Sequence, residues 1–147
     1  MKFLKSYFNL FTPKFEQNAK NISLLFGRIT FGGMMLFGHG IPKLAKFEQN
    51  PIKFADPLGI GVSLSLSLAV FAEVVCATLL ILGIATRFAS LQLLFTMAVA
   101  AFLVHEGDPF FGRPGKEFAM VYLSGYMMFF LMGPGKYSID GLLKKRV

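Results

Sequence analysis

Two polar residues suited to acid–base or ligand-binding chemistry lie on a strongly apolar stretch, GRITFGGMMLFGHGIPKL, which covers residues 27–44. They are Arg28 and His39, and at 100° per residue an ideal helix brings them to within about 20° of one face. A charge near the middle of a membrane costs about 2.5 kcal/mol or more, so it normally faces the protein interior and meets a partner. The spacing therefore predicts that both side chains point inward, toward polar groups.

Three further titratable residues are candidates for those groups. Glu73 is the one charge in the apolar run 61–85, His105 follows the run 88–104, and Glu117 directly precedes the run 118–132. Depth counted along these runs places Arg28 and Glu73 near the middle of the membrane, where we expect them to form an ion pair. His39, His105 and Glu117 fall together at the outer surface. The sequence thus predicts a small-molecule or proton site above a buried ion pair.

Each of these residues also has a purely structural interpretation. The Arg28–Glu73 pair would then only fix the register of two helices, and each histidine would only end a helix at the interface. Haem ligation by His39 and His105 is disfavoured, because two histidines that end separate helices commonly occur without one. A metal site is disfavoured too, because no tight ligand spacing supports it and Cys76 is the one cysteine; its ligands would be His39, His105, Glu106 or Asp108, and Glu117. No catalytic residue is identified by these patterns.

The composition is that of a membrane protein. Hydrophobic residues make up 54% of the chain and charged residues 16%, well below the roughly 25% charge of a soluble domain. The formal net charge is +7, but the basic residues gather at the ends of apolar segments and do not interleave with aromatic residues on a polar surface. This pattern argues against nucleic-acid binding and makes the lipid bilayer the first partner.

Four apolar runs predict four membrane-spanning helices, at about residues 22–38, 61–85, 88–104 and 118–132. Gly40 and Pro42 are expected to end the first span, and Lys43 after them is expected to reach lipid phosphate. The fold class is therefore an all-α membrane protein, a four-transmembrane-helix bundle with an amphipathic N-terminal segment.

Three parts of unequal size follow from this pattern. Residues 1–21 form a basic amphipathic segment, expected to lie on an anionic membrane surface, with a solvated tail as the alternative. Residues 22–143 form the membrane domain, and residues 144–147 form a basic tail.

The orientation follows from lysine and arginine in the flanks of the spans. Nine of them flank the side that carries both termini and five flank the other side, where acidic residues share the loops. Both termini are therefore expected to be cytoplasmic.

Three segments together resemble a known family. The stretch 27–44, the segment AEVVCATLLILGIATRF at residues 72–88 and the closing GPGKYSID at residues 133–140 are similar to those of the DoxX family of small bacterial membrane proteins. The resemblance covers about residues 22–143 and implies a four-span bundle in the bacterial inner membrane. It also implies a link to quinol oxidase or thiosulfate:quinone oxidoreductase activity. The positions that match the family pattern are Arg28, His39, Gly40, Lys43, Glu73, Gly83 and Arg87.

Two classes of function stay open on this basis. One is a redox-linked subunit that binds a quinone or a similar small apolar ligand, a soluble or membrane oxidoreductase partner, or both; whether it is itself a quinone-linked enzyme is undecided. The other is a small transporter or membrane scaffold, and a homo-oligomer is compatible with either. A redox subunit needs an apolar cleft near His39, His105 and Glu117, whereas a transporter needs a polar lining that reaches both faces. Nothing charged continues below Arg28 and Glu73, which slightly favours the first class.

Overall fold

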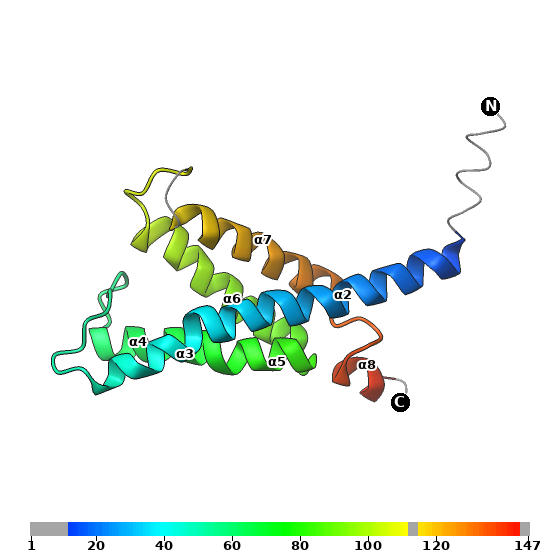
Figure 1. Cartoon of the computed structure of the whole chain (residues 1–147), viewed down its shortest axis with the longest axis horizontal. Coiled ribbons are helices and arrows are strands. Elements are labelled where there is room, and N and C mark those ends of the chain that lie inside the picture. The colour runs from blue at the N-terminus through cyan, green and yellow to red at the C-terminus, as the bar shows by residue number, and fades with distance from the viewer. Residues whose placement is uncertain (1–11, 112–114, 145–147) are drawn as a thin grey trace.

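The protein is an all-helical bundle, as the sequence predicts. The computed structural model describes residues 12–111 and 115–144. Within these ranges the chain forms helices and turns and contains no strand (Figure 1).

The first helix is one long rod built from four consecutive elements. These are α2 (Pro13–Met35), the π-helical turn η1 (Leu36–Gly40), α3 (Ile41–Leu44) and the 3-10 turn η2 (Ala45–Glu48). Together they span 36 residues. The start is well defined, because the Thr12 hydroxyl accepts a hydrogen bond of 3.2 Å from the Phe15 N–H. Pro13 occupies the first helical position, where no backbone donor is needed.

The expected end of this helix at Gly40 and Pro42 is wrong. The chain stays helical to Glu48, since the π turn that precedes Pro42 already departs from the regular i to i−4 pattern and accommodates a residue without an N–H. Residues 13–21 belong to the same helix as the first predicted span, with no break near residue 21. Residues 1–11 of the predicted amphipathic segment lie outside the described residues.

Three more long helices follow within the described residues. The second consists of α4 (Val62–Val70), the π turn η3 (Phe71–Cys76) and α5 (Ala77–Leu82). The third consists of α6 (Thr86–Val99) and the π turn η4 (Ala100–Val104). The fourth is α7 (Lys116–Met132), and a short helix α8 (Ile139–Leu143) follows it.

Length and composition make this a multi-pass membrane protein. Among the described residues, three helices are long and apolar enough to cross a membrane: Pro13–Glu48, Val62–Leu82 and Thr86–Val104, with 36, 21 and 19 residues. The helix α7 has 17 residues and carries Lys116 and Glu117 in its first turn. All four predicted spans are therefore helical, and three of them meet the requirement for a membrane span.

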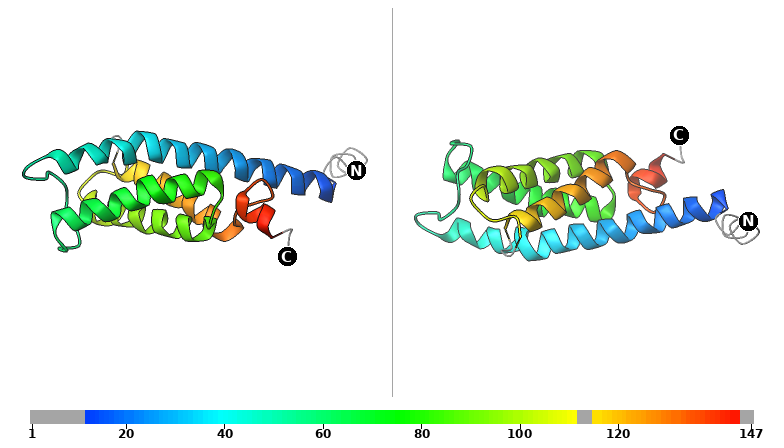
Figure 2. Two further views of the ribbon diagram at one scale, coloured as in Figure 1. Left: turned by 90° about the horizontal axis from the view of Figure 1, so that it is seen from below. Right: turned by 90° about the horizontal axis from the view of Figure 1, so that it is seen from above.

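The helices run up and down between two distinct ends. At one end lie the start of the first helix, the turn at residues 83–85 and α8; we call it the terminal end. At the other end lie the connector 49–61 and the turn at residues 105–111; we call it the loop end. Figures 1 and 2 show the start of α2 and the end of α8 together on the side of the terminal end. The third helix packs along α7, and the first helix packs against α5 and α7.

Aromatic residues join the first helix to α7. Phe31 makes edge-on contacts with Tyr122, Tyr126 and Phe129, with ring centroids 5.9, 6.3 and 6.0 Å apart. Tyr126 and Phe129 are fully buried, as expected for packing residues. Large apolar side chains also cover the outer surface, which suits contact with lipid; Phe26 is 70% exposed, Phe37 68% and Leu131 64%.

Candidate functional site

The buried acid of the second helix pairs with a lysine of the first. Lys43 Nζ lies 2.5 Å from Glu73 Oε2, and the two side chains are 20% and 5% exposed. The expectation that Glu73 pairs with Arg28 is therefore wrong, and so is the expectation that Lys43 reaches lipid phosphate. An ion pair this far from water is strong only if it is well enclosed, because desolvation opposes the attraction between the charges.

A glycine sets the register of this pair. A Cβ atom at Gly40 would lie only 2.5 Å from the Glu73 carbonyl oxygen, so the two backbones touch where Gly40 lies. Lys43 is one turn further along the same face of the first helix and reaches over to the Glu73 side chain. The close approach at Gly40 thus brings lysine and glutamate within bonding distance.

Arg28 lies at the other end of the bundle. Its Nη1 donates to the carbonyl oxygens of Leu80 and Ile81 at 3.3 and 3.2 Å, and its Nη2 donates to the Tyr137 carbonyl oxygen. Gly40 contacts Glu73 and is twelve residues beyond Arg28, so about 18 Å of helix separates Arg28 from the glutamate backbone. The two charges are too far apart for an ion pair.

The segment around Arg28 is tied together by further polar groups. Lys136 N–H donates to the Asn21 side chain at 3.0 Å, and Asp140 N–H donates to the Gly83 carbonyl oxygen at 2.9 Å. Arg28 itself is fully buried, and its Nε has no hydrogen-bond partner among the described residues. Gly83 has a φ of 69°, and any Cβ there would overlap the guanidinium group and Ser138. The backbone at Gly83 therefore packs directly against the guanidinium group of Arg28.

Asp140 caps the start of the third helix, although it is more than fifty residues away in the sequence. Its carboxylate accepts hydrogen bonds of 2.9 Å from Ala85 N–H, Thr86 N–H and the Thr86 hydroxyl. Burial alone raises the pKa of this carboxyl group, but the hydrogen bonds outweigh burial and the pKa lies below its usual value. Asp56 caps the second helix in a similar way through Ile60 N–H, Gly61 N–H and the Ser65 hydroxyl.

A pocket of about 360 Å³ opens beside the Lys43–Glu73 pair. Its walls come from the second and third helices and from the connector, and they are mostly apolar. Its polar lining residues are Lys43, Ser65, Glu73, Gln92, Thr96 and His105. Of the predicted site residues, Glu73 and His105 line this pocket, whereas Arg28, His39 and Glu117 do not.

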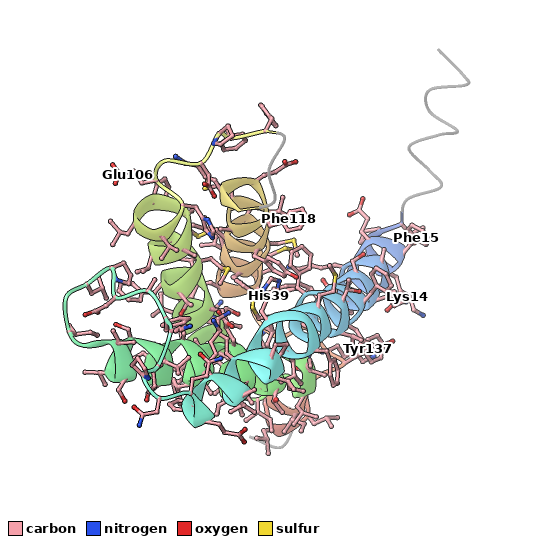
Figure 3. All side chains as sticks on the ribbon, turned by 60° about the vertical axis from the view of Figure 1, so that its left-hand side comes forward. Lys14, Phe15, His39, Glu106, Phe118 and Tyr137 are labelled. Carbon is pink, nitrogen blue, oxygen red and sulfur yellow. The ribbon has the colours of Figure 1, made fainter. Side chains whose placement is uncertain are left out.

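His39 lies on the side of the first helix that faces α7. Its ring is edge-on to that of Tyr122, with centroids 5.6 Å apart, and Figure 3 shows it between the two helices. Arg28 instead contacts α5, so the predicted shared face does not occur. The π turn Leu36–Gly40 contains His39, and it changes the angle per residue that the ideal-helix calculation assumes.

His105 ends the third helix at the mouth of the pocket. Its Nδ1 lies 2.7 Å from Asp108 Oδ2, and both side chains are 36% exposed. Glu117 lies half-buried in the first turn of α7. Within the described ranges, no hydrogen bond or ring contact joins His39, His105 and Glu117, and His105 pairs with Asp108 instead.

The pocket residues share a backbone feature. Glu73 lies within the π turn η3, Lys43 follows the π turn η1 after two residues, and His105 directly follows the π turn η4. Isolated π turns inside α-helices occur often at functional sites, where the wider turn aims a side chain out of its regular position. The coincidence of three of them supports a functional interpretation of this end of the bundle.

Three important residues were not among the candidates from the sequence. Lys43 was assigned to lipid, because Pro42 suggested the end of a helix. Asp108 was considered only as a metal ligand, although its spacing of three residues from His105 is a usable signal. Asp140 could not be found from spacing, because its partners Ala85 and Thr86 are more than fifty residues away in the sequence.

The model of the DoxX family matches residues 23–106, a range that includes Arg28, Lys43, Glu73 and His105. The chain belongs to the DoxX family. This match confirms the resemblance found in the sequence, although its range ends before Asp108, Glu117 and Asp140.

Two relatives of this DoxX protein come from Haemophilus influenzae, and both are described as uncharacterized proteins. One is 34% identical over 127 residues, which cover 84% of this chain and 92% of the relative. The other is 29% identical over 101 residues and covers 67% of each chain. No solved structure matches this chain.

Proposed function

We propose that this DoxX protein is a membrane-embedded binding subunit for a quinone-type ligand, a ring with oxygen substituents and an apolar tail. The observation that carries the proposal is the pocket of about 360 Å³ with a buried lysine–glutamate pair and a histidine in its lining. Ligand pockets typically have volumes of about 300–1,000 Å³ and combine apolar walls with a few polar groups that fix orientation. This pocket has both properties.

The pocket chemistry suits such a ligand. Only one of the three N–H groups of Lys43 is needed for Glu73, so the others can donate to a ligand oxygen. The wall residues Leu58, Leu68 and Phe95 are also 45%, 50% and 57% exposed on the apolar outer surface. A tail can therefore leave the pocket toward lipid while the ring stays near Lys43.

The redox role is the part of the proposal that rests on the family resemblance. A subunit that holds a quinone-type ligand in the membrane would exchange electrons with a soluble or membrane oxidoreductase partner through that ligand. The transporter alternative is weaker, because the polar groups at the terminal end are enclosed by backbone and Arg28 does not line the pocket.

We further propose that α7 is a fourth span in the bacterial inner membrane and that both termini are cytoplasmic. Support comes from its close packing along α6 and from the excess of basic residues on the terminal side. A reporter fused after Val147 is expected to be active only in its cytoplasmic form, and one inserted near Asn50 only in its exported form. The opposite pair of results contradicts the orientation.

The proposed binding of a quinone-type ligand is tested by calorimetric titration of the purified protein, in detergent, with a short-tailed benzoquinone. The double variant Lys43→Met with Glu73→Leu removes both charges together and is expected to weaken binding tenfold or more, which is about 1.4 kcal/mol. Lys46→Met is the matched control, because Lys46 lies on the same helix and does not line the pocket.

Two further variants distinguish ligand binding in the pocket from ligand binding at the site predicted from the sequence. If His39, His105 and Glu117 formed the site, His39→Ala and Glu117→Ala would weaken binding tenfold. The pocket geometry predicts nearly unchanged affinity for both. Absence of saturable binding to the parent protein rejects the quinone proposal and favours the transporter or scaffold.

A further inference from the structure

We infer that the pocket prefers the reduced, hydroxyl-bearing form of its ligand over the oxidised, carbonyl-bearing form, and that His105, held by Asp108, makes the distinction. This inference rests on the proposed function and adds which chemical form is bound. The reduced ring carries O–H groups that donate hydrogen bonds, whereas the oxidised ring carries only acceptors. A pocket group that accepts a hydrogen bond therefore favours the reduced form.

The contact with Asp108 decides which nitrogen of His105 accepts. An ionised carboxylate can only accept hydrogen bonds, so at 2.7 Å from Asp108 Oδ2 the Nδ1 atom must carry the proton. In neutral imidazole the other nitrogen, Nε2, is then an acceptor. Among the described residues, none bonds to Nε2, and His105 is part of the pocket lining.

A glycine holds this arrangement in place. A Cβ atom at Gly115 would lie 2.7 Å from His105 Nδ1 and 3.2 Å from Cε1, and it would overlap the Asp108 carboxylate. The backbone at the start of α7 therefore covers the His105–Asp108 pair closely and limits rotation of the ring. A carboxylate that fixes the orientation and tautomer of a histidine in this way is a positioning residue.

The lysine–glutamate pair distinguishes the two forms less strongly. Lys43 only donates, and both a carbonyl oxygen and a hydroxyl oxygen accept from it. Glu73 accepts from Lys43 through Oε2, and the positive charge of Lys43 makes the remaining Glu73 lone pairs weaker acceptors for a hydroxyl group. At His105, by contrast, a hydroxyl group of the reduced ligand donates a hydrogen bond to Nε2. A carbonyl oxygen of the oxidised ligand has no proton to donate, so this hydrogen bond cannot form. One hydrogen bond of this kind corresponds to a preference of about tenfold.

The test measures affinity for both forms of one compound. Parent protein in detergent is titrated at pH 8 under argon with a short-tailed benzoquinone and, separately, with its hydroquinone kept reduced by an excess of reductant. The parent is expected to bind the hydroquinone about tenfold more tightly. Asp108→Ala and His105→Phe are each expected to bring the ratio of affinities close to one, mainly by weakening hydroquinone binding.

Glu106→Gln is the matched control, because Glu106 is an exposed acid beside His105 that does not line the pocket. Its ratio should equal that of the parent, and thermal unfolding checks that every variant is folded. If the parent binds both forms equally, or if both variants keep the preference, the inference is overturned while the proposed function stands. If the parent binds neither form, the proposed function fails together with the inference.

Discussion

The two ends of the bundle handle buried charge in opposite ways. At the terminal end, Arg28 is fully buried and bonds to backbone carbonyl groups of α5 and of the segment before α8. At the loop end, Lys43 bonds to the Glu73 side chain, and the pair borders a pocket of about 360 Å³. A charge held by backbone fixes the fold, whereas a charge held by another side chain beside open space remains usable by a ligand.

The terminal end has a hollow of its own, which sharpens the contrast. It measures about 340 Å³ and is lined by Thr86, Arg87, Asp140 and Lys144 among others, but not by Arg28. The Asp140 carboxylate in it is occupied by three hydrogen bonds to the start of α6. The polar groups of this end therefore hold segments of the chain together.

The largest effect is expected from Arg28→Met. The substitution removes the charged donor from the carbonyl groups of Leu80, Ile81 and Tyr137, of which Leu80 keeps a hydrogen bond from the Gly83 N–H. Hydrogen bonds to a charged group contribute about 1.5–3 kcal/mol each. Thermal unfolding in detergent should show a loss of about 3 kcal/mol or more. A stable variant with reduced ligand affinity would instead mean that Arg28 belongs to the binding site.

The next effect tests the ion pair at the loop end. Glu73→Gln leaves the Lys43 charge unpaired, and breaking a buried ion pair in this way lowers the free energy of unfolding by about 3 kcal/mol. The loss is smaller here, because the Lys43 side chain is 20% exposed and water partly solvates its charge. The double change Lys43→Met with Glu73→Leu should unfold at a higher temperature than Glu73→Gln alone. Greater damage in the double variant would show that the two charges do not depend on each other.

A smaller effect is expected from Gly40→Ala. The new Cβ atom would lie 2.5 Å from the Glu73 carbonyl oxygen, so the first and second helices must separate slightly, at a cost of about 1–3 kcal/mol. Gly33→Ala is the matched control, because no atom lies within 4 Å of a Cβ there. Equal unfolding temperatures for the two variants would contradict the close approach at Gly40.

The smallest effect is expected from Asp140→Asn, at about 1 kcal/mol for a weakened helix cap. Because the pKa of Asp140 is lowered in the folded protein, its stabilising contribution is fully present above its unfolded value, near pH 4, and disappears as the pH falls through the folded value. Unfolding measured against pH should show parent and variant converging only in strong acid. If the difference in unfolding between parent and variant stays the same at the lowest pH, the stabilisation does not come from the ionised Asp140 carboxylate.

The sequence predicted the helices well, because long apolar runs leave few alternatives. Helices at all four predicted spans and membership of the DoxX family were accessible in this way. The contacts between polar residues were harder to predict. The predicted Arg28–Glu73 ion pair was wrong because the first helix begins at Pro13 and not at residue 22. Its register against the second helix is set by the contact at Gly40, which no sequence pattern reveals.

The same limit applies to the candidate site. Glu73 and His105 were found because a charge or a histidine stands out against an apolar run. Lys43 was not recognised as the partner of Glu73, since the π turns shift side chains away from ideal helical positions and have no simple sequence signature. Asp108 was missed as the partner of His105, although the spacing of three residues could have indicated it. The direction in which a side chain points from a helix can therefore be predicted only where the helix is regular.

The length of the first helix has a mechanical consequence. Its 36 residues correspond to about 54 Å, against about 30 Å of hydrocarbon, and Figure 1 shows its start extending beyond the other helices. No glycine or proline occurs from Lys14 to Phe26, so this part has no hinge. Arg28, which bonds to carbonyl groups of α5, anchors the base of this projecting arm, so a sideways force at Lys14 is resisted at the terminal end of the bundle.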